Sequence, residues 1–251
     1  MRPSLAGWHR TLALAGITVG AACLFLFLRQ DLLLLAEGQY WKSVQSPRII
    51  SAYLSTPGIH KLQIGAGSSR KSGWLNTDIE KRDGLAFLDA TKPFPLPDGS
   101  VRAVFSEHVI EHLTFDEGRF MLKECHRVLA PGGRIRIATP NLLKFTRLLQ
   151  VDLPDDVRRF EGRKLQWHKW PQTVDPGCFI LNMQLREWGH QFIYTPKMLR
   201  GRLEKFGFTD VREFQPGISD DPELADMEAR SEWNFRDVNA EETMILQAVR
   251  R

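Results

Sequence analysis

The chain has 251 residues, 43% hydrophobic and 25% charged, which suits one medium-sized globular domain with a short appendage. Its net charge of +4 comes from basic residues scattered along the chain, which argues against nucleic-acid binding. The three cysteines, Cys23, Cys125 and Cys178, form no CxxC pair, which argues against a disulfide framework and a zinc knuckle.

The first forty residues differ in composition from the rest of the chain. Residues 11–28 form an uncharged apolar run between Arg10 and Arg29, and residues 32–35 add four leucines. A membrane-spanning helix needs about 20 apolar residues, and this run is close to that length. We therefore predict that residues 1–40 anchor the chain to a membrane or associate with one, through residues 11–35. A cleaved signal peptide, or a helix lying on the membrane surface or on the domain, are the alternatives.

Residues 41–60 are predicted to form a linker or a covering helix, and a domain is predicted over residues 61–251. In this domain short apolar runs alternate with helical patterns. Strands are predicted at residues 61–64, 74–79, 85–88, 101–105, 134–138, 211–214 and 243–249. The alternation predicts an α/β fold with an open, mostly parallel, twisted sheet and helices on both faces.

Two helices of the domain are predicted from their capping residues. Thr114 and Glu117 match a capping box, in which each side chain satisfies the other residue's backbone N–H. Thr195 followed by Pro196 is typical of the start of another helix, which Gly207 would close.

Polar features follow three consecutive predicted strands. The first strand ends in Gly65-Ala66-Gly67, where glycines let the backbone turn tightly and approach a ligand. Asp78 ends the second strand, where a carboxylate can accept hydrogen bonds from both hydroxyls of a ribose. Asp89 follows the third, where a carboxylate can accept from an adenine amino group. Each feature alone is typical of an ordinary turn, but together they predict a nucleoside site at the carboxyl ends of the strands.

A glycine loop followed by an acid also occurs in nicotinamide-dependent oxidoreductases. The third glycine of their fingerprint is absent, because Arg70 stands in its place. This function is therefore the less favoured alternative.

Three segments, KLQIGAGSSRKSGWLNTDIE, FLDATKPFPLPDGSVRAVFSEHVIEHL and ECHRVLAPGGRIRIATPN, resemble class I S-adenosylmethionine-dependent methyltransferases. The resemblance is to the type 11 group of small bacterial proteins, and it extends over residues 61–251. It implies a Rossmann-like seven-stranded sheet of order 3-2-1-4-5-7-6 with strand seven antiparallel, and S-adenosylmethionine as the cofactor. It places Gly65, Ala66 and Gly67 near the methionine moiety, Asp78 on the ribose, Asp89 and Ala90 near the adenine, and Ser106 and Glu107 beside the sulfonium.

The chain departs from this pattern in its first crossover. Only about nine residues separate Gly65 from Trp74, whereas a helical crossover takes about 10–12 or more. The first helix is therefore predicted to be shortened or missing, which makes the assignment of Asp78 to the ribose less secure.

Residues 108–112, HVIEH, match the HxxEH pattern of inverted zinc peptidases. Zinc chemistry also needs a third protein ligand and an open position. The pattern follows a strand, where the methyltransferase group has its own EHxxEHL. We therefore predict no metal site, and expect Glu111 and His112 to hydrogen-bond backbone at a helix start.

Methyl transfer from a sulfonium is an in-line displacement, so the protein mainly aligns the acceptor and excludes water. A hydroxyl acceptor needs a base, whereas a neutral amine needs little more than positioning. Candidate bases are His108 and His190, with Glu107 as a third; His190 also suits a capping or packing role.

Residues 141–190 are predicted to be a long insertion, of the kind that often forms a lid. Its Trp167, Trp170 and Trp188, together with basic residues, suit a sugar, a phosphorylated glycan or a lipid head group. In the alternative interpretation these tryptophans pack the insertion onto the domain.

The sequence thus favours an enzyme that methylates an oxygen or nitrogen of a small-molecule, glycan or lipid-linked acceptor near a membrane. The catalytic domain would face the cytosol, where the cofactor is made. A non-catalytic, membrane-tethered scaffold of the same fold is the second hypothesis, because the first crossover is truncated.

Overall fold

The computed structural model describes residues 29–150, 152–167, 169, 175–228 and 241–251. The chain divides into two compact units, residues 1–45 and 46–251. In the first unit, residues 29–40 are helical and are followed by a π-helix, Trp41–Gln45. The predicted anchor residues 11–28 lie outside the described residues. Within the part that is described, no helix is long and apolar enough to cross a membrane.

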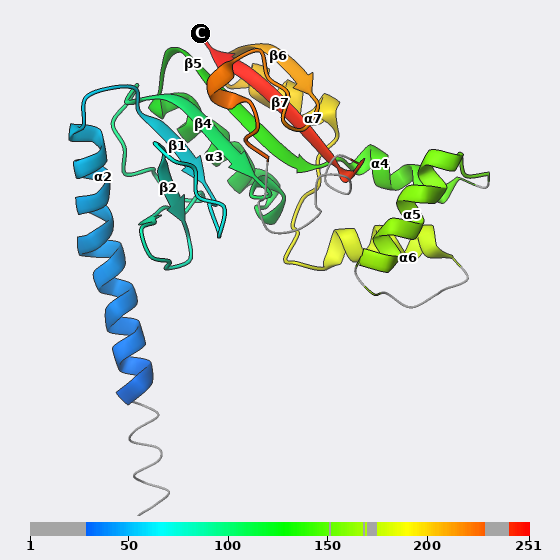
Figure 1. Ribbon diagram of the computed structural model, residues 1–251, viewed down its shortest axis with the longest axis horizontal. Coiled ribbons are helices and arrows are strands. Elements are labelled where there is room, and N and C mark those ends of the chain that lie inside the picture. The colour runs from blue at the N-terminus through cyan, green and yellow to red at the C-terminus, as the bar shows by residue number, and fades with distance from the viewer. Residues whose placement is uncertain (1–28, 151, 168, 170–174, 229–240) are drawn as a thin grey trace, which may run out of the picture. The chain divides into compact units, whose positions relative to one another are not determined.

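A seven-stranded sheet forms the centre of the second unit (Figure 1). Its strands are β1 (Lys61–Ile64), β2 (Leu75–Asp78), β3 (Ala86–Phe87), β4 (Val101–Glu107), β5 (Leu129–Pro140), β6 (Phe208–Phe214) and β7 (Thr243–Arg250). Their order is β3-β2-β1-β4-β5-β7-β6, and β7 runs antiparallel to both of its neighbours. The strand order predicted from the sequence is confirmed.

Two helices, α3 (Phe115–Val128) and α7 (Pro196–Lys205), pack beside each other on the sheet. The predicted capping box is present, because the Thr114 side chain accepts from Glu117 N and the Glu117 carboxylate accepts from Thr114 N. The apolar face of α3 contributes Met121, Cys125 and Val128 to the main core, and all three are fully buried. Helix α3 ends at Val128, and β5 begins at the next residue, Leu129.

The segment before β1 forms a helix, α2 (Ser46–Ser55), which packs beside β3. The Ser46 hydroxyl accepts a hydrogen bond from Phe87 N at 2.8 Å, which ties this helix to the edge strand. The segment predicted as a linker or a covering helix, residues 41–60, thus contains a helix that contacts the sheet edge.

The first crossover contains turns but no helix between β1 and β2, as the short spacing predicted. The Asn76 side chain holds this loop closed. Its Oδ1 accepts from Lys71 N at 2.7 Å, and its Nδ2 donates to the carbonyls of Lys71 and Trp74. Side-chain bonds to the backbone thus replace the intrahelical bonds that a longer crossover would supply.

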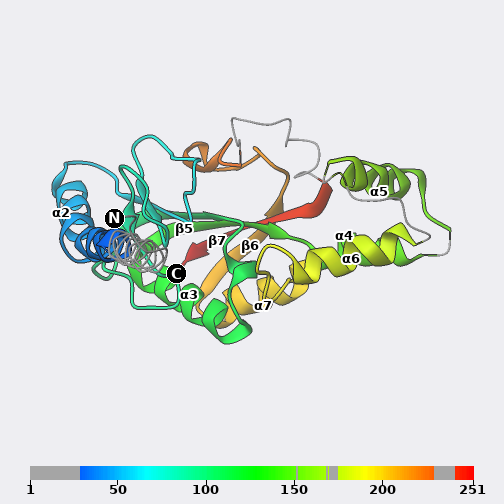
Figure 2. The same cartoon turned by 90° about the horizontal axis from the view of Figure 1, so that it is seen from below.

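The insertion after β5 is helical and has a small core of its own. It consists of α4 (Leu142–Thr146), the 3₁₀ helix η3 (Arg147–Leu149), α5 (Asp155–Trp167) and α6 (Pro176–Arg186). These helices gather beyond the ends of β5 and β7 (Figure 2), and their core includes Phe145, Phe160 and Ile180. The buried Lys164 is paired with Glu242 just ahead of β7, which fastens the insertion to that end of the sheet.

Candidate functional site

Three adjacent strands end at the same level. In the sheet, Ile64 of β1 is paired with Thr77 of β2 and with Ser106 of β4. The next residues along these strands, Gly65, Asp78 and Glu107, therefore lie side by side at the carboxyl edge of the sheet. This is the edge at which open α/β sheets bind their ligands.

The glycine loop needs glycine at two positions. Gly65 and Gly67 have φ values of +68° and +51°, in the left-handed region that favours glycine. A Cβ atom on Gly65 would lie 2.3 Å from Val109 Cγ2, so the loop also packs too closely there for a side chain. Gly67 N donates to Asp78 Oδ2 at 2.7 Å.

The Asp78 carboxylate bonds backbone N–H groups both in the glycine loop and just after its own strand. Its second oxygen, Oδ1, accepts from Glu80 N at 2.9 Å. A carboxylate offers about four acceptor positions, so two backbone donors leave capacity for a ligand hydroxyl. The carboxylate is therefore fixed in place beside the loop by bonds that the sequence did not predict.

A pocket of about 200 Å³ opens beside the glycine loop. It is lined by Gln63, residues 65–69, Arg82 and Glu107. Among the described residues, two buried oxygens at this strand end have no hydrogen-bond partner: Gln63 Oε1 and Ser106 Oγ. An unsatisfied buried polar atom costs about 1–3 kcal/mol, and a polar ligand would remove that cost.

Asp89 and Ala90 lie outside the lining of this pocket. Asp89 Oδ1 instead accepts from Thr91 N at 2.9 Å and from the Thr91 hydroxyl at 2.7 Å. The structure thus brings Gly65, Ala66, Gly67 and Glu107 together in one pocket, with Asp78 bonded to its loop. Ser106 is buried outside the lining, and Asp89 and Ala90 lie at a turn.

A second group of side chains surrounds Glu111, in the short 3₁₀ helix η2 (Ile110–His112) that follows β4. His108 Nδ1 lies 2.8 Å from Glu111 Oε1, and the Thr139 hydroxyl donates to Glu111 Oε2 at 3.0 Å. The Glu111 carboxylate therefore bonds two side chains in addition to a backbone N–H, its own, whereas the sequence predicted only a backbone bond. His108 has a φ of +51°, which sends the chain sharply away from the strand.

Glu111 is ionised despite its burial. Burial raises the pKa of its carboxyl, but the hydrogen bond and the charge of His108 outweigh this effect, so the pKa lies below its usual value. Because an ionised carboxylate only accepts, His108 Nδ1 carries the proton that is shared with it. This arrangement orients the His108 ring, and in the neutral form of the ring the basic nitrogen is Nε2.

His190 reaches the same place from a distant part of the chain. The backbone N–H groups of Gln191 and Phe192 both donate to the Glu111 carbonyl, at 2.7 and 3.1 Å. His190 Nδ1 lies 2.6 Å from the Gln184 carbonyl, which only accepts, so Nδ1 carries the proton. Burial holds the pKa of His190 below its usual value, and the ring is therefore neutral with a lone pair on Nε2.

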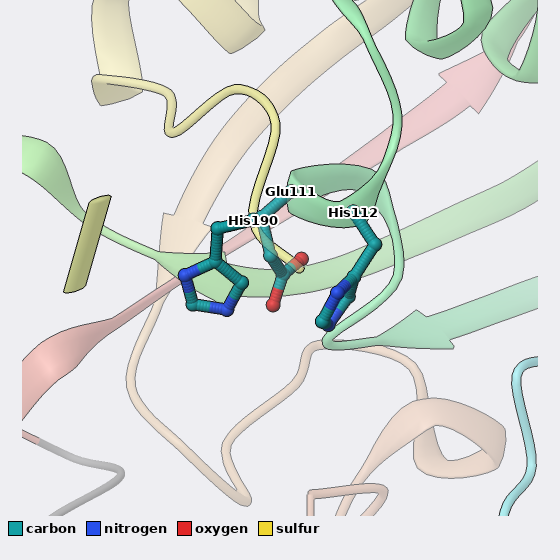
Figure 3. Close-up of side chains that lie close together, drawn as sticks. All are labelled: Glu111, His112 and His190. Carbon is teal, nitrogen blue, oxygen red and sulfur yellow. The ribbon is translucent and has the colours of Figure 1, made fainter. Parts of the chain in front are cut away.

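Figure 3 shows the Glu111 carboxylate between the rings of His112 and His190. The two ring centroids are 4.9 Å apart, and His112 is exposed to solvent. The structure thus brings together His108 and His190, two of the three predicted bases. Glu107, the third, lines the glycine-loop pocket instead.

Three residues of the site were not predicted from the sequence. Gln63 and Thr139 lie within strands, where alternation alone does not separate a ligand-facing polar residue from a structural one. Glu111 was noted only as part of the HxxEH pattern. Its spacing of three residues from His108 was nevertheless a signal for the observed pair.

Residues 80–137 match a family model described as a methyltransferase domain. A protein of Mycolicibacterium smegmatis named "Probable S-adenosylmethionine-dependent methyltransferase" is 50% identical over 52 residues, which cover 21% of this chain and 20% of that protein. A protein of Mycobacterium tuberculosis with a similar name is 48% identical over 52 residues, 21% of this chain and 18% of that protein. The matched stretch thus spans about a fifth of the length of these curated relatives.

Among solved structures, a SAM-dependent methyltransferase from Archaeoglobus fulgidus is 18% identical. The match covers 81% of this chain and 90% of that one, with a TM-score of 0.48. The resemblance that the sequence segments indicated is confirmed by the family model and the named relatives.

Proposed function

We propose that the chain carries a class I S-adenosylmethionine-dependent methyltransferase domain and is an enzyme that transfers a methyl group from this cofactor to an oxygen or nitrogen of an acceptor. The observation that carries the proposal is the set of groups at the ends of β1, β2 and β4. There a glycine loop, the Glu107 carboxylate and the unsatisfied Gln63 Oε1 line one pocket, Asp78 bonds the loop, and the unsatisfied Ser106 Oγ lies buried at the end of β4.

The residues present suit the cofactor. Gly65 and Gly67 allow a ligand to approach the backbone without a Cβ in the way, and Asp78 has acceptor capacity for ribose hydroxyls. Gln63 Oε1 and Ser106 Oγ offer buried oxygens to polar atoms of the ligand. Glu107 places a carboxylate in the pocket, where it would attract the cofactor's positive charge.

When bound, the cofactor supplies an electrophilic methyl group on a positively charged sulfur. The chain's own residues hold and orient the reactants. The Glu111–His108 pair fixes a ring whose Nε2 is basic, immediately after the β4 end that reaches the cofactor pocket. His190, with its own basic Nε2, faces the same carboxylate from the loop ahead of α7. A hydroxyl acceptor would lose its proton to one of these nitrogens.

The acceptor that fits the proposal is a glycan or a lipid-linked intermediate near a membrane surface. Leu32, Leu33, Leu34 and Leu35 are all more than half exposed, which supports membrane association of that segment. Trp188 is also exposed, beside the site's His190, where an aromatic ring suits the apolar face of a sugar. Trp170 and the side chain of Trp167 lie outside the described residues. We propose a cytosolic orientation for the domain, since the cofactor is made there.

A non-catalytic scaffold is the second candidate, and the missing first helix favours it. Such a protein would bind the cofactor but methylate nothing. Detection of methyl transfer by the purified chain would exclude this alternative.

Substitution of Ser106 separates a ligand-binding role from a structural one. Because the Ser106 hydroxyl has no partner among the described residues, Ser106→Ala should leave the unfolding free energy unchanged or higher. If the hydroxyl bonds the cofactor, calorimetry should show that the affinity for S-adenosylhomocysteine falls about tenfold. This fall corresponds to a loss of about 1.4 kcal/mol of binding free energy.

The matched control is Ser100→Ala, at the residue just before the same strand, where the hydroxyl bonds Pro97 O. This variant should bind S-adenosylhomocysteine like the parent. Failure of the parent protein to bind either S-adenosylmethionine or S-adenosylhomocysteine would refute the proposed function. A labelled-methyl assay on lysate fractions would then identify the acceptor.

A further inference from the structure

Glu111, His112 and His190 bring three ligand-type atoms within 4.8 Å of one another (Figure 3). We propose that these residues bind a divalent transition-metal ion, and that this ion holds a hydroxyl oxygen of the acceptor. The second part rests on the proposed methyl transfer, whereas the first part does not. The sequence alone showed only the HxxEH pattern; the fold supplies His190 as the third ligand.

The donor set suits such an ion. Two imidazoles and one carboxylate are ligands of Zn²⁺, Mn²⁺ and Fe²⁺, and three protein ligands leave positions open for water or substrate. Metal bonds of about 2.0–2.2 Å place ligand atoms at most about 4.4 Å apart. From a separation of up to 4.8 Å, the set closes around an ion by small rotations of the two rings.

The hydrogen-bond partners of the proposed ligands are of the kind found in metal sites. A ligating histidine donates its other N–H to a carbonyl or a carboxylate, and a ligating carboxylate is itself hydrogen-bonded. His190 Nδ1 donates to Gln184 O, which directs the lone pair to Nε2. Glu111 is fixed by His108 on one oxygen and by Thr139 on the other, and each oxygen keeps a lone pair for an ion.

The position of the cluster explains what the ion would do. Glu111 is fully buried, whereas His112 is exposed, so the open side of the cluster faces solvent and an incoming acceptor. Residue Glu107, four positions before Glu111, lines the cofactor pocket. An acceptor oxygen bound to the ion would therefore lie at the same strand end as the proposed methyl donor.

This arrangement favours an alcohol or a phenol over an amine as the acceptor. A hydroxyl bound to a divalent ion loses its proton more readily, here to solvent. Its oxygen then forms the new bond to the methyl carbon as the carbon–sulfur bond breaks, and that bonding pair stays on sulfur. A neutral amine needs no such activation.

Binding of Co²⁺ tests the site directly, because its visible absorption reports the ligand set. The full-length chain would carry a tag without histidines and be freed of metal with EDTA before titration with Co²⁺ alone, and then with Mn²⁺ and Zn²⁺. We expect about one equivalent to bind with nitrogen–oxygen coordination. His112→Ala and His190→Ala should each weaken binding by at least about tenfold.

His60→Ala is the matched control, since this histidine bonds Thr56 O away from the cluster. It should bind metal like the parent. All variants would also be tested for S-adenosylhomocysteine binding in EDTA, which should be unchanged.

No metal binding by the parent, or binding that survives both cluster substitutions, would overturn the inference. If S-adenosylhomocysteine still binds in that case, the proposed methyltransferase stands, with His108 and His190 acting as metal-free bases. Loss of S-adenosylhomocysteine binding in the parent would refute the proposed function independently of the metal result.

Discussion

Substitution of Gly65 by alanine tests the geometry of the glycine loop. The left-handed backbone, with φ of +68°, costs an alanine about 1–2 kcal/mol. The new Cβ would also lie 2.3 Å from Val109 Cγ2, and overpacking of this kind costs about 1–3 kcal/mol. We expect Gly65→Ala to lower the unfolding free energy by about 2–5 kcal/mol as the sum of these two effects.

A matched control and a double-mutant cycle separate the two contributions. Gly67 has a φ of +51°, but a Cβ there would meet nothing within 4 Å, so Gly67→Ala should cost only the backbone contribution, about 1–2 kcal/mol. In a Val109→Ala background the nearest remaining atom to the alanine at position 65 is the residue 109 Cβ, at 3.7 Å. The steric contribution should then disappear, which gives a coupling energy of about 1–3 kcal/mol.

The assay is urea unfolding of the full-length chain, followed by tryptophan fluorescence, together with calorimetric binding of S-adenosylhomocysteine. A Gly65→Ala variant that is no less stable than Gly67→Ala would refute the argument from close packing. Additive effects of Gly65→Ala and Val109→Ala would do the same, because they would show that the two side chains do not meet.

Three further predictions concern the framework of the domain. Arg136 and Glu228 form a buried bidentate pair, so Arg136→Ala should cost about 3–5 kcal/mol, and replacing both residues by methionine should recover most of this loss in urea unfolding. Thr114→Ala removes the cap of α3 and should cost about 1 kcal/mol, whereas Thr114→Ser should cost less. The Arg127 hydrogen bond holds the pKa of Glu124 below its usual 4.5, so the unfolded chain binds more protons in acid. The stability that this pair contributes is present above pH 4.5 and should be lost as the pH falls through the lower folded-state pKa, and Glu124→Gln should flatten that part of the stability–pH curve.

The sequence predicted those parts of the fold that depend on local patterns. The Thr114 capping box and the buried stripe of α3 follow from residues a few positions apart, and the structure shows both. The missing first helix was also predictable, because chain length alone limits what can bridge two parallel strands. The Asn76 side chain that closes this crossover was not predictable, since its role depends on a loop conformation that no periodicity encodes.

The candidate site likewise has a part that local patterns predict and a part that depends on contacts between distant segments. Gly65, Asp78 and Glu107 could be placed together from the sequence, because carboxyl ends of neighbouring parallel strands share an edge. The approach of His190 to Glu111 could not be predicted, since the two residues are 79 positions apart and no local pattern connects them. The contact is made by backbone hydrogen bonds from Gln191 and Phe192 to the Glu111 carbonyl. Contacts of this kind depend on how the chain returns to the sheet after the insertion.

The conformation of His108 links the two halves of the site. Glu107 ends β4 and lines the glycine-loop pocket, while the next residue, His108, turns into the left-handed region and its ring bonds Glu111. Glycine would adopt this turn freely, whereas a histidine there costs about 1–2 kcal/mol. The Glu111 hydrogen bond offsets part of that cost and requires an imidazole at this position. In the proposed function the strained turn would have a chemical use, because it directs the Glu107 carboxylate to the glycine-loop pocket and the His108 ring to Glu111 within two consecutive residues.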